Sequence, residues 1–279
     1  MPVPVVLPVT LPELPDLGDH HIGGRPTVPA VELLELLVRT VAEHESWAGH
    51  LPLPFAMSEV SFPRFLPADE IERCAFEIAL ERCEGSVHAS LTSRIALGGG
   101  MRRARIHVDA KLGLARMPLP SPPPAIACDY EIPAARVYRE LVPFGPRYCN
   151  LRGVTRLGPE GGKAIVRSPV PPRQPPPLSS CPYLLDAAMH LACVWGQRFA
   201  GYVAYPTGFS MRLLRKPTPA GERQCLVVPT TVEPRRLLCN LWLVDEHGEA
   251  ADAVLGLAMS PLAASTPPPP WIALARERA

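Results

Sequence analysis

Proline restricts the structure of this chain more than any other residue. The sequence holds 37 prolines among 279 residues, and many of them fall in three runs, at Met117–Pro124, Pro169–Pro177 and Pro267–Pro270. A proline fixes φ and lacks a backbone N–H, so such runs favour extended chain and are excluded from helix interiors and central strands. We therefore expect a linker near the middle of the chain, a loop that leads into a helix, and a C-terminal tail.

Two segments, Pro29–His44 and Pro182–Ala200, show the periodicity of helices that bury one face. In the first, the apolar residues at helical spacing are Val31, Leu34, Val38 and Val41. In the second, a proline opens the helix and Gly201 suits its end, because glycine adopts the left-handed conformation that closes many helices.

Most of the remaining sequence alternates apolar and polar residues, which predicts half-buried strands. Examples are Cys74–Leu80, Arg105–Leu112, Leu237–Val244 and Ala253–Met259, of which the last two flank a polar turn and predict a hairpin. Each half of the chain thus has one long helix near its start and several strands after it. The pattern predicts an α+β fold with two similar halves, each a helix wrapped by an antiparallel sheet.

Charge and cysteine content argue against several classes of function. The formal net charge is +1, whereas a nucleic-acid-binding protein usually shows a clustered basic stripe. None of the eight cysteines forms a CxxC pair, which argues against a zinc ribbon. Free cysteines on apolar strand positions indicate a reducing, cytoplasmic compartment. The sequence shows no signal peptide and no apolar run of about 18 residues, so we expect no membrane span.

The segment Asp19–Pro29 is the first candidate for chemistry. From His20 it spells HxxxGxxxxP and leads directly into the first predicted helix. Glycines let the backbone approach a ligand, and free N–H groups at a helix N-terminus can polarise a carbonyl oxygen. A histidine beside them is a competent base at neutral pH. A solvated surface loop fits the same residues, and a zinc site at His20 and His21 lacks a third ligand.

The second candidate is Asp186, which precedes His190 by four residues and shares its face of the second predicted helix. The residues around Asp186 are apolar. Burial among them should raise the pKa of the carboxyl, as a general acid requires, whereas the nearby helix N-terminus lowers that pKa. A stabilising pair on an exposed helix face is the alternative interpretation.

Together these motifs resemble those of the dehydratase domains of polyketide synthases and of the related polyunsaturated fatty acid synthases. The family carries HxxxGxxxxP in its first half and Dxxx(Q/H) in its second. The matching residues here are His20, Gly24 and Pro29, then Asp186 and His190. The sequence FGPRY, which begins at Phe144, is similar to the family's YGPxF motif, and the resemblance runs from about Leu11 to Leu262.

The resemblance implies a double hotdog, in which two helix-in-sheet halves form one chain. Residues 1–116 would be the N-terminal half with the catalytic histidine, and 117–130 the proline-rich linker. Residues 131–265 would be the C-terminal half with the catalytic aspartate, and 266–279 a proline-rich tail. The single site would lie between the halves.

The resemblance further implies a hydro-lyase that converts a 3-hydroxyacyl thioester to a 2-enoyl thioester in polyketide or fatty acid synthesis. His20 would remove the proton beside the carbonyl, Asp186 would protonate the departing hydroxyl, and His190 would orient Asp186. The implied substrate-binding residues are Gly24, Pro29, Phe144, Gly145, Pro146 and Tyr148. The substrate would arrive on the phosphopantetheine of an acyl carrier protein, with no metal or separate cofactor. A homodimer and contacts with other synthase domains are also implied.

One position departs from the family, because Phe144 stands where tyrosine is common. If that hydroxyl helps to bind the leaving group, Tyr148 or another donor must replace it. Two other functions remain open. One is a product-template-like cyclase or enoyl isomerase that uses the same histidine, and the other is a non-catalytic module that holds an acyl chain.

Overall fold

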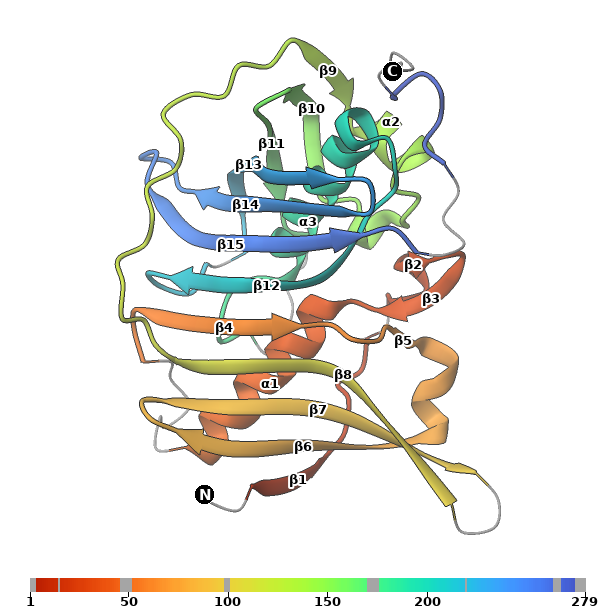
Figure 1. Cartoon of the computed structure of the whole chain (residues 1–279), viewed down its shortest axis with the longest axis vertical. Helices are drawn as coiled ribbons and strands as arrows, with labels where there is room; N and C mark the ends of the chain where they lie inside the picture. The colour runs from red at the N-terminus through yellow and green to blue at the C-terminus, as the bar shows by residue number, and fades with distance from the viewer. Residues whose placement is uncertain are drawn as a thin grey trace.

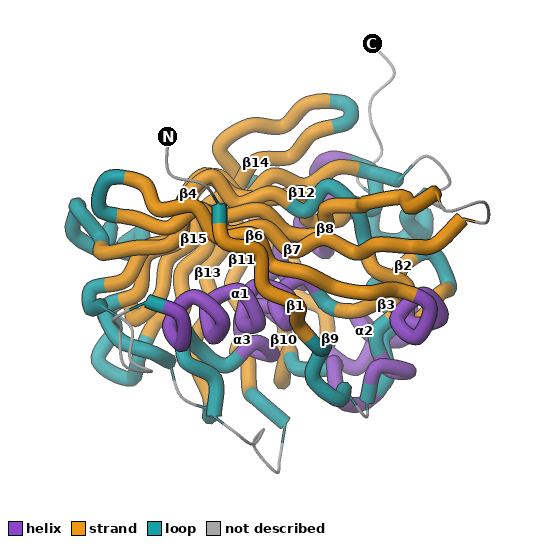
Figure 2. Tube along the Cα trace, turned by 90° about the horizontal axis from the view of Figure 1, so that it is seen from below, coloured by secondary structure: helices purple, strands orange, loops and turns teal. Residues whose placement is uncertain are grey.

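The computed structural model describes residues 4–14, 16–45, 52–97, 101–169, 176–218, 220–262 and 267–273. In these residues, twelve strands form one antiparallel sheet in the order β1-β6-β7-β8-β4-β12-β15-β14-β13-β11-β10-β9. Three short strands form a second sheet in the order β2-β3-β5. Helices α1 and α3 lie on the same side of the large sheet (Figures 1 and 2).

The strands of the large sheet are β1 (Val5–Val9), β4 (Phe55–Ser61), β6 (Cys74–Cys83), β7 (Ser86–Leu97), β8 (Met101–Leu114), β9 (Tyr130–Pro133), β10 (Leu151–Gly158), β11 (Gly161–Arg167), β12 (Tyr205–Leu214), β13 (Glu222–Glu233), β14 (Arg236–Val244) and β15 (Ala250–Ser260). The small sheet contains β2 (His21–Ile22), β3 (Arg25–Val28) and β5 (Leu66–Pro67). The α-helices are α1 (Ala30–His44), α2 (Ala134–Glu140) and α3 (Pro182–Trp195).

The order of the strands divides the large sheet into two halves. The first five strands in this order, which are β1, β6, β7, β8 and β4, precede residue 115, and β6, β7 and β8 contact α1. The other seven follow residue 129, and β10, β11, β13 and β14 contact α3. The two halves join edge to edge, because β4 pairs with β12 from Ser61–Gly208 to Phe55–Leu214. One helix in one antiparallel sheet therefore occurs twice, and the predicted double hotdog is confirmed.

The two long helices differ in burial. Helix α1 occupies the predicted segment, with Pro29 just before it, and buries one face that includes Leu37 and Val41. Helix α3 does not fit the prediction of a single buried face, since every residue from Pro182 to Trp195 is buried. It is covered by α1 and by strands on several sides, so a helix that is apolar all round is stable there. A π-helical turn extends it to Ala200, and Gly201 ends it at a φ of 74°.

Two of the proline-rich segments pack against the folded halves. Over the outer face of the sheet, Ile126 packs with Trp242, whose indole N–H donates to the carbonyl of Pro120 at 3.2 Å. Near the C-terminus, Ile272 is fully buried and the Trp271 ring lies under the Arg136 guanidinium at 3.6 Å. Residues 170–175, 266 and 274–279 of the predicted loop and tail lie outside the described residues, and the proposed domain boundaries stay a prediction.

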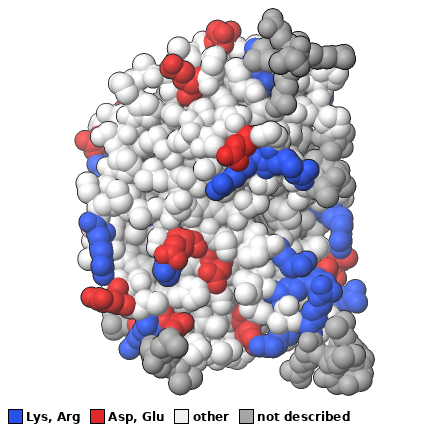
Figure 3. Space-filling model, viewed as in Figure 1, with Lys and Arg blue, Asp and Glu red and all other residues white. Residues whose placement is uncertain are grey.

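The outer face of the sheet carries charge in small groups. Figure 3 shows acidic and basic side chains separated by broad uncharged areas on this face.

None of the described helices is long and apolar enough to cross a membrane. The helices cover the opposite, inner face of the sheet, where the large hydrophobic core lies.

Candidate active site

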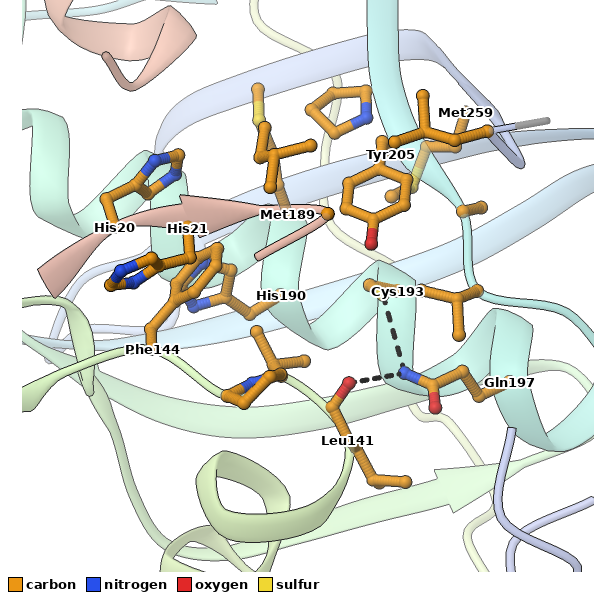
Figure 4. A pocket seen from close by; sticks show the side chains of 18 of the residues that line it. His20, His21, Leu141, Phe144, Met189, His190, Cys193, Gln197, Tyr205 and Met259 are labelled. Carbon is orange, nitrogen blue, oxygen red and sulfur yellow. Dashed lines mark hydrogen bonds between the residues drawn. The ribbon is translucent and has the colours of Figure 1, made fainter. Parts of the chain in front are cut away.

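A cavity of about 700 Å³ is lined by residues of both halves. The first half contributes residues 20–24 and the start of α1, and the second contributes residues 140–144 and one face of α3. The α3 residues that line it, with one from the turn that follows, are Asp186, Met189, His190, Cys193 and Gln197. Figure 4 shows several of these side chains around the cavity. Its size falls within the range of about 300–1,000 Å³ that is typical of small-molecule sites.

A short hairpin positions His20. Strands β2 and β3 pair across a turn in which Gly23 and Gly24 have φ values of 59° and 79°, a conformation that favours glycine. The ring Nδ1 of His20 lies 2.7 Å from the carbonyl oxygen of Thr27. Because a carbonyl can only accept, Nδ1 carries the proton and donates it. The lone pair is therefore on Nε2, which is the form that a general base requires.

Asp186 faces His20 from the other half of the molecule. Its Oδ1 lies 3.9 Å from His20 Nε2, and the two residues are only 6% and 4% exposed. Both line the same cavity. A carboxyl and an imidazole from opposite halves thus meet at one apolar cavity, an arrangement that can give and take protons at neighbouring atoms of one ligand.

His190 contacts the second oxygen of the same carboxyl. Its Nε2 lies 2.9 Å from Asp186 Oδ2, one helical turn away on α3. The two atoms lie within hydrogen-bonding distance, but their alignment does not make a well-formed hydrogen bond. Loose hydrogen bonds of this kind are common in ligand-free active sites and tighten when substrate binds. The two carboxyl oxygens therefore have different partners, His20 for Oδ1 and His190 for Oδ2.

The pKa values of the facing pair move in the same direction. Burial lowers the pKa of His20 below its ordinary value, although Asp186 and the Thr27 carbonyl oppose this change. For Asp186, burial raises the pKa, but attraction and hydrogen bonding by His190, with a contribution from His20, leave it below the usual range. The sequence left open whether the pKa of Asp186 would rise through burial or fall through a neighbouring charge. In the structure it falls, because the attraction of His190 and His20 outweighs desolvation.

The aromatic residues of the FGPRY segment pack on the two histidines. The ring centroid of Phe144 lies 4.5 Å from that of His20 and 4.8 Å from that of His190, and Phe144 lines the cavity. Tyr148 contacts the His20 ring edge-on at 5.1 Å but is not among the cavity-lining residues. Its hydroxyl is therefore not placed to substitute for the one that Phe144 lacks.

The other predicted contact residues have different positions. Gly24 lines the cavity, whereas Pro29, Gly145 and Pro146 do not. Pro29 is the residue before α1, and its carbonyl accepts the first N–H bonds of that helix. Gly145 and Pro146 lie behind the cavity wall, where the N–H of Gly145 donates to the carbonyl of Asp19 at 2.7 Å.

The structure gives two residues of this site a role that the sequence analysis did not predict. The side chain of Asp19 accepts the backbone N–H of Arg147 at 2.9 Å and so ties the FGPRY segment to the His20 loop. The hydroxyl of Tyr138, on α2, lies 3.2 Å from His190 Nδ1. The position of Asp19 beside His20 was an available signal, but Tyr138 falls in an ordinary amphipathic segment.

The described residues form no group of three or more histidine, cysteine or carboxylate side chains that could hold a metal ion. His20 and Asp186 are the side chains of this site that could exchange protons with a ligand. An apolar ligand would fit between them, since most of the surrounding side chains are aliphatic or aromatic.

No protein-family model matches the chain, and no curated protein shows significant sequence similarity to it. Solved structures match over almost the whole length. The dehydratase domain from the CurJ module of the curacin polyketide synthase matches with a TM-score of 0.70 and 16% identity, over 88% of this chain and 86% of that one. A trans-AT polyketide synthase dehydratase domain from Brevibacillus brevis matches with a TM-score of 0.72 and 16% identity, over 92% and 93%.

The dehydratase domain of PpsC from Mycobacterium tuberculosis, solved in complex with C12:1-CoA, has a TM-score of 0.70 and 18% identity, over 93% of this chain and 97% of that one. Similarity at this level of identity establishes a common fold. The chain therefore adopts the double-hotdog fold of polyketide synthase dehydratase domains.

Proposed function

We propose that the protein is a hydro-lyase that removes water from a 3-hydroxyacyl thioester to give a 2-enoyl thioester. The observation that carries this proposal is the 3.9 Å separation of His20 Nε2 and Asp186 Oδ1 in one apolar cavity. The reaction needs a base at C2 and an acid at the oxygen on C3, two adjacent carbons of the substrate. A facing base and acid at this spacing suit that geometry.

In the proposed reaction, His20 Nε2 takes the proton from C2. The electron pair of the C2–H bond becomes the C2–C3 double bond, and the C3–O bond breaks. Asp186 gives its proton to the departing hydroxyl, which leaves as water. His20 is then protonated and Asp186 is an anion, so transfer of one proton from His20 to Asp186 restores the starting state.

The ligand itself helps Asp186 to carry a proton. In the free protein, His190 and His20 keep the pKa of this carboxyl below its usual range. An acyl chain in the cavity would displace water from the carboxyl, and loss of water disfavours the charged form. Binding of the substrate thus favours the protonated acid that the reaction needs.

Backbone groups of the first half are the proposed partners of the thioester oxygen. Ala30 and Val31 occupy the first turn of α1 and line the cavity. The first N–H groups of a helix have no partner within the helix, and they attract the negative charge that develops on a carbonyl oxygen. These groups and the backbone of Gly24 would stabilise the enolate-like charge that follows removal of the C2 proton.

The carrier of the substrate is part of the proposal. A 3-hydroxyacyl group on the phosphopantetheine of an acyl carrier protein is the form that the resemblance implies, in polyketide or fatty acid synthesis. A cytoplasmic homodimer that works with other synthase domains is proposed on the same basis. Residues 1–116 and 131–265 remain the proposed catalytic halves.

Purified protein incubated with 3-hydroxyacyl-pantetheine tests the function. We expect a product that has lost the mass of one water and that absorbs as an enoyl thioester. His20→Ala and Asp186→Asn should each lower the rate by about 10²- to 10⁴-fold, the usual contribution of a positioned acid or base. A product of unchanged mass would instead indicate isomerisation.

The matched control is a second histidine–aspartate pair. His88 and Asp109 lie 2.9 Å apart on neighbouring strands and do not line the cavity. His88→Ala and Asp109→Asn should keep the wild-type rate. Turnover that survives in both His20→Ala and Asp186→Asn would overturn the proposed function.

A further inference from the structure

The hydroxyl of Tyr138 has three hydrogen-bond partners. The backbone N–H groups of Asn150 and Leu151 each donate to it at 2.8 Å, and His190 Nδ1 lies 3.2 Å away. Tyr138 is buried on α2, and the Asn150 and Leu151 backbone is where strand β10 begins. The hydroxyl therefore connects the start of β10 to the histidine beside Asp186.

The valence of the hydroxyl decides the direction of the third bond. Backbone N–H groups can only donate, so the two of them occupy both lone pairs of the Tyr138 oxygen. The single O–H proton is then left to point at His190 Nδ1, which must accept it. Burial raises the pKa of Tyr138 well above its ordinary value, so the hydroxyl keeps this proton at all ordinary pH values.

A ring nitrogen that accepts a hydrogen bond carries no proton of its own. The proton of the neutral His190 ring is therefore on Nε2, the nitrogen that lies 2.9 Å from Asp186 Oδ2. His20 has the opposite tautomer, because the Thr27 carbonyl holds the proton on its Nδ1. Asp186 Oδ2 thus lies close to the nitrogen that carries the His190 proton, although the two are imperfectly aligned, and Oδ1 faces a lone pair of His20 across the cavity.

We propose that Tyr138 is a positioning residue that holds His190 in its Nε2–H tautomer and thereby directs the acidic proton of Asp186 to Oδ1. In the other tautomer, a lone pair on Nε2 would compete for that proton at Oδ2, where His190 rather than the substrate would receive it. Asp186 Oδ1 is the oxygen that faces His20, so a proton there is available for the leaving hydroxyl. This inference rests on the proposed function for its catalytic consequence but not for the tautomer.

Nuclear magnetic resonance of isotope-labelled histidine tests the tautomer directly in the full-length protein. The nitrogen shifts of His190 should report Nε2–H in the wild type and a mixture of tautomers in Tyr138→Phe. Tyr202→Phe is the control, because it removes a tyrosine hydroxyl that also bonds the backbone, as a donor to the exposed carbonyl of Glu233 at 3.0 Å, and that does not bond His190. An Nδ1–H tautomer in the wild type, or an unchanged tautomer in Tyr138→Phe, would overturn the inference.

Kinetics separate positioning from a merely structural role. Tyr138→Phe should lower kcat by about tenfold or more with a smaller change in KM, in the range typical of groups that orient an active-site residue. Glutamine has no tautomers, so in a His190→Gln background the same substitution should lower kcat much less. An equal loss in both backgrounds would assign Tyr138 to packing alone and contradict the proposal.

The two readouts also distinguish this inference from the proposed function. If the wild type shows the Nε2–H tautomer but no dehydration, the proposed function fails and the assignment of the tautomer stands. If dehydration occurs with the other tautomer, the function stands and the role of Tyr138 is wrong.

Discussion

Gly145 lies directly against Asp19, the residue that precedes the proposed base. Its N–H donates to the Asp19 carbonyl at 2.7 Å, and a Cβ at this position would lie 2.1 Å from Asp19 Oδ1. Carbon and oxygen atoms that are not bonded to each other do not approach so closely, so only glycine fits here without movement of Asp19. This contact is how the FGPRY segment of the second half holds the His20 loop of the first.

Gly145→Ala should therefore damage the site from behind the cavity wall. The new methyl group forces Asp19 to rotate away from the Arg147 N–H, and overpacking of this kind costs about 1–3 kcal/mol of stability. We expect a lower midpoint in urea unfolding and a lower kcat/KM. Gly18→Ala is the control, because a Cβ there meets no atom within 4 Å. Equal behaviour of the two variants would contradict the proposed coupling.

The pH dependence of kcat/KM should reflect the lowered pKa of His20. His20 must be unprotonated to act as a base, and its burial holds the pKa below the ordinary value of 6.5. The loss of kcat/KM that protonation of His20 causes should thus have its midpoint below pH 6.5. An acidic limb centred above that value would show that His20 is not the group that titrates.

The same shift makes a prediction about stability. An unfolded chain binds a proton at His20 near pH 6.5, whereas the folded protein resists it, so the free energy of unfolding should fall as pH drops below that value. Urea unfolding between about pH 5 and 7 measures this slope. In His20→Ala the slope should be smaller, and an unchanged slope would mean that other groups produce it.

The ring of Phe144 contacts both the His20 and His190 rings, with centroids at 4.5 and 4.8 Å. Phe144→Leu should lower kcat by roughly tenfold, because each aromatic contact is worth about 0.5–1.5 kcal/mol. Phe144→Tyr keeps the ring and should retain most of the activity. Steady-state rates of both variants test this, and equal losses would show that the ring contacts do not matter.

The C-terminal segment should influence which acyl chains the cavity accepts. Pro267 and Pro269 line the cavity, and the segment is held by Trp271 under Arg136 and by the buried Ile272. Trp271→Ala removes a cation–π contact worth about 0.5–2 kcal/mol and loosens this wall. We expect kcat/KM to rise for long acyl chains relative to short ones. A profile of chain length that does not change would limit the segment to a role in packing.

The helices and strands with a clear periodicity could be recognised from the order of their residues alone. The helical spacing of 29–44, the alternation in Cys74–Leu80 and the hairpin of β14 and β15 depend on local periodicity, which a strand or helix displays along its own length. The candidate base and acid could also be found locally, because His20 lies in a loop that leads into one predicted helix and Asp186 lies near the start of the other. The burial of α3 on all sides could not be predicted in this way, because the residues that surround this helix come from other parts of the chain.

The order of residues was enough to predict the type of each half, the positions of their helices and the candidate base and acid. The fold was needed to bring His20 Nε2 and Asp186 Oδ1 face to face and to place the Tyr138 hydroxyl beside His190. It was also needed to weigh burial of Asp186 against the attraction of His190 and His20, which together lower its pKa. Periodicity and helix starts are properties of neighbours along the chain, whereas burial and the contacts of His20 and Tyr138 come from residues that are far apart in sequence.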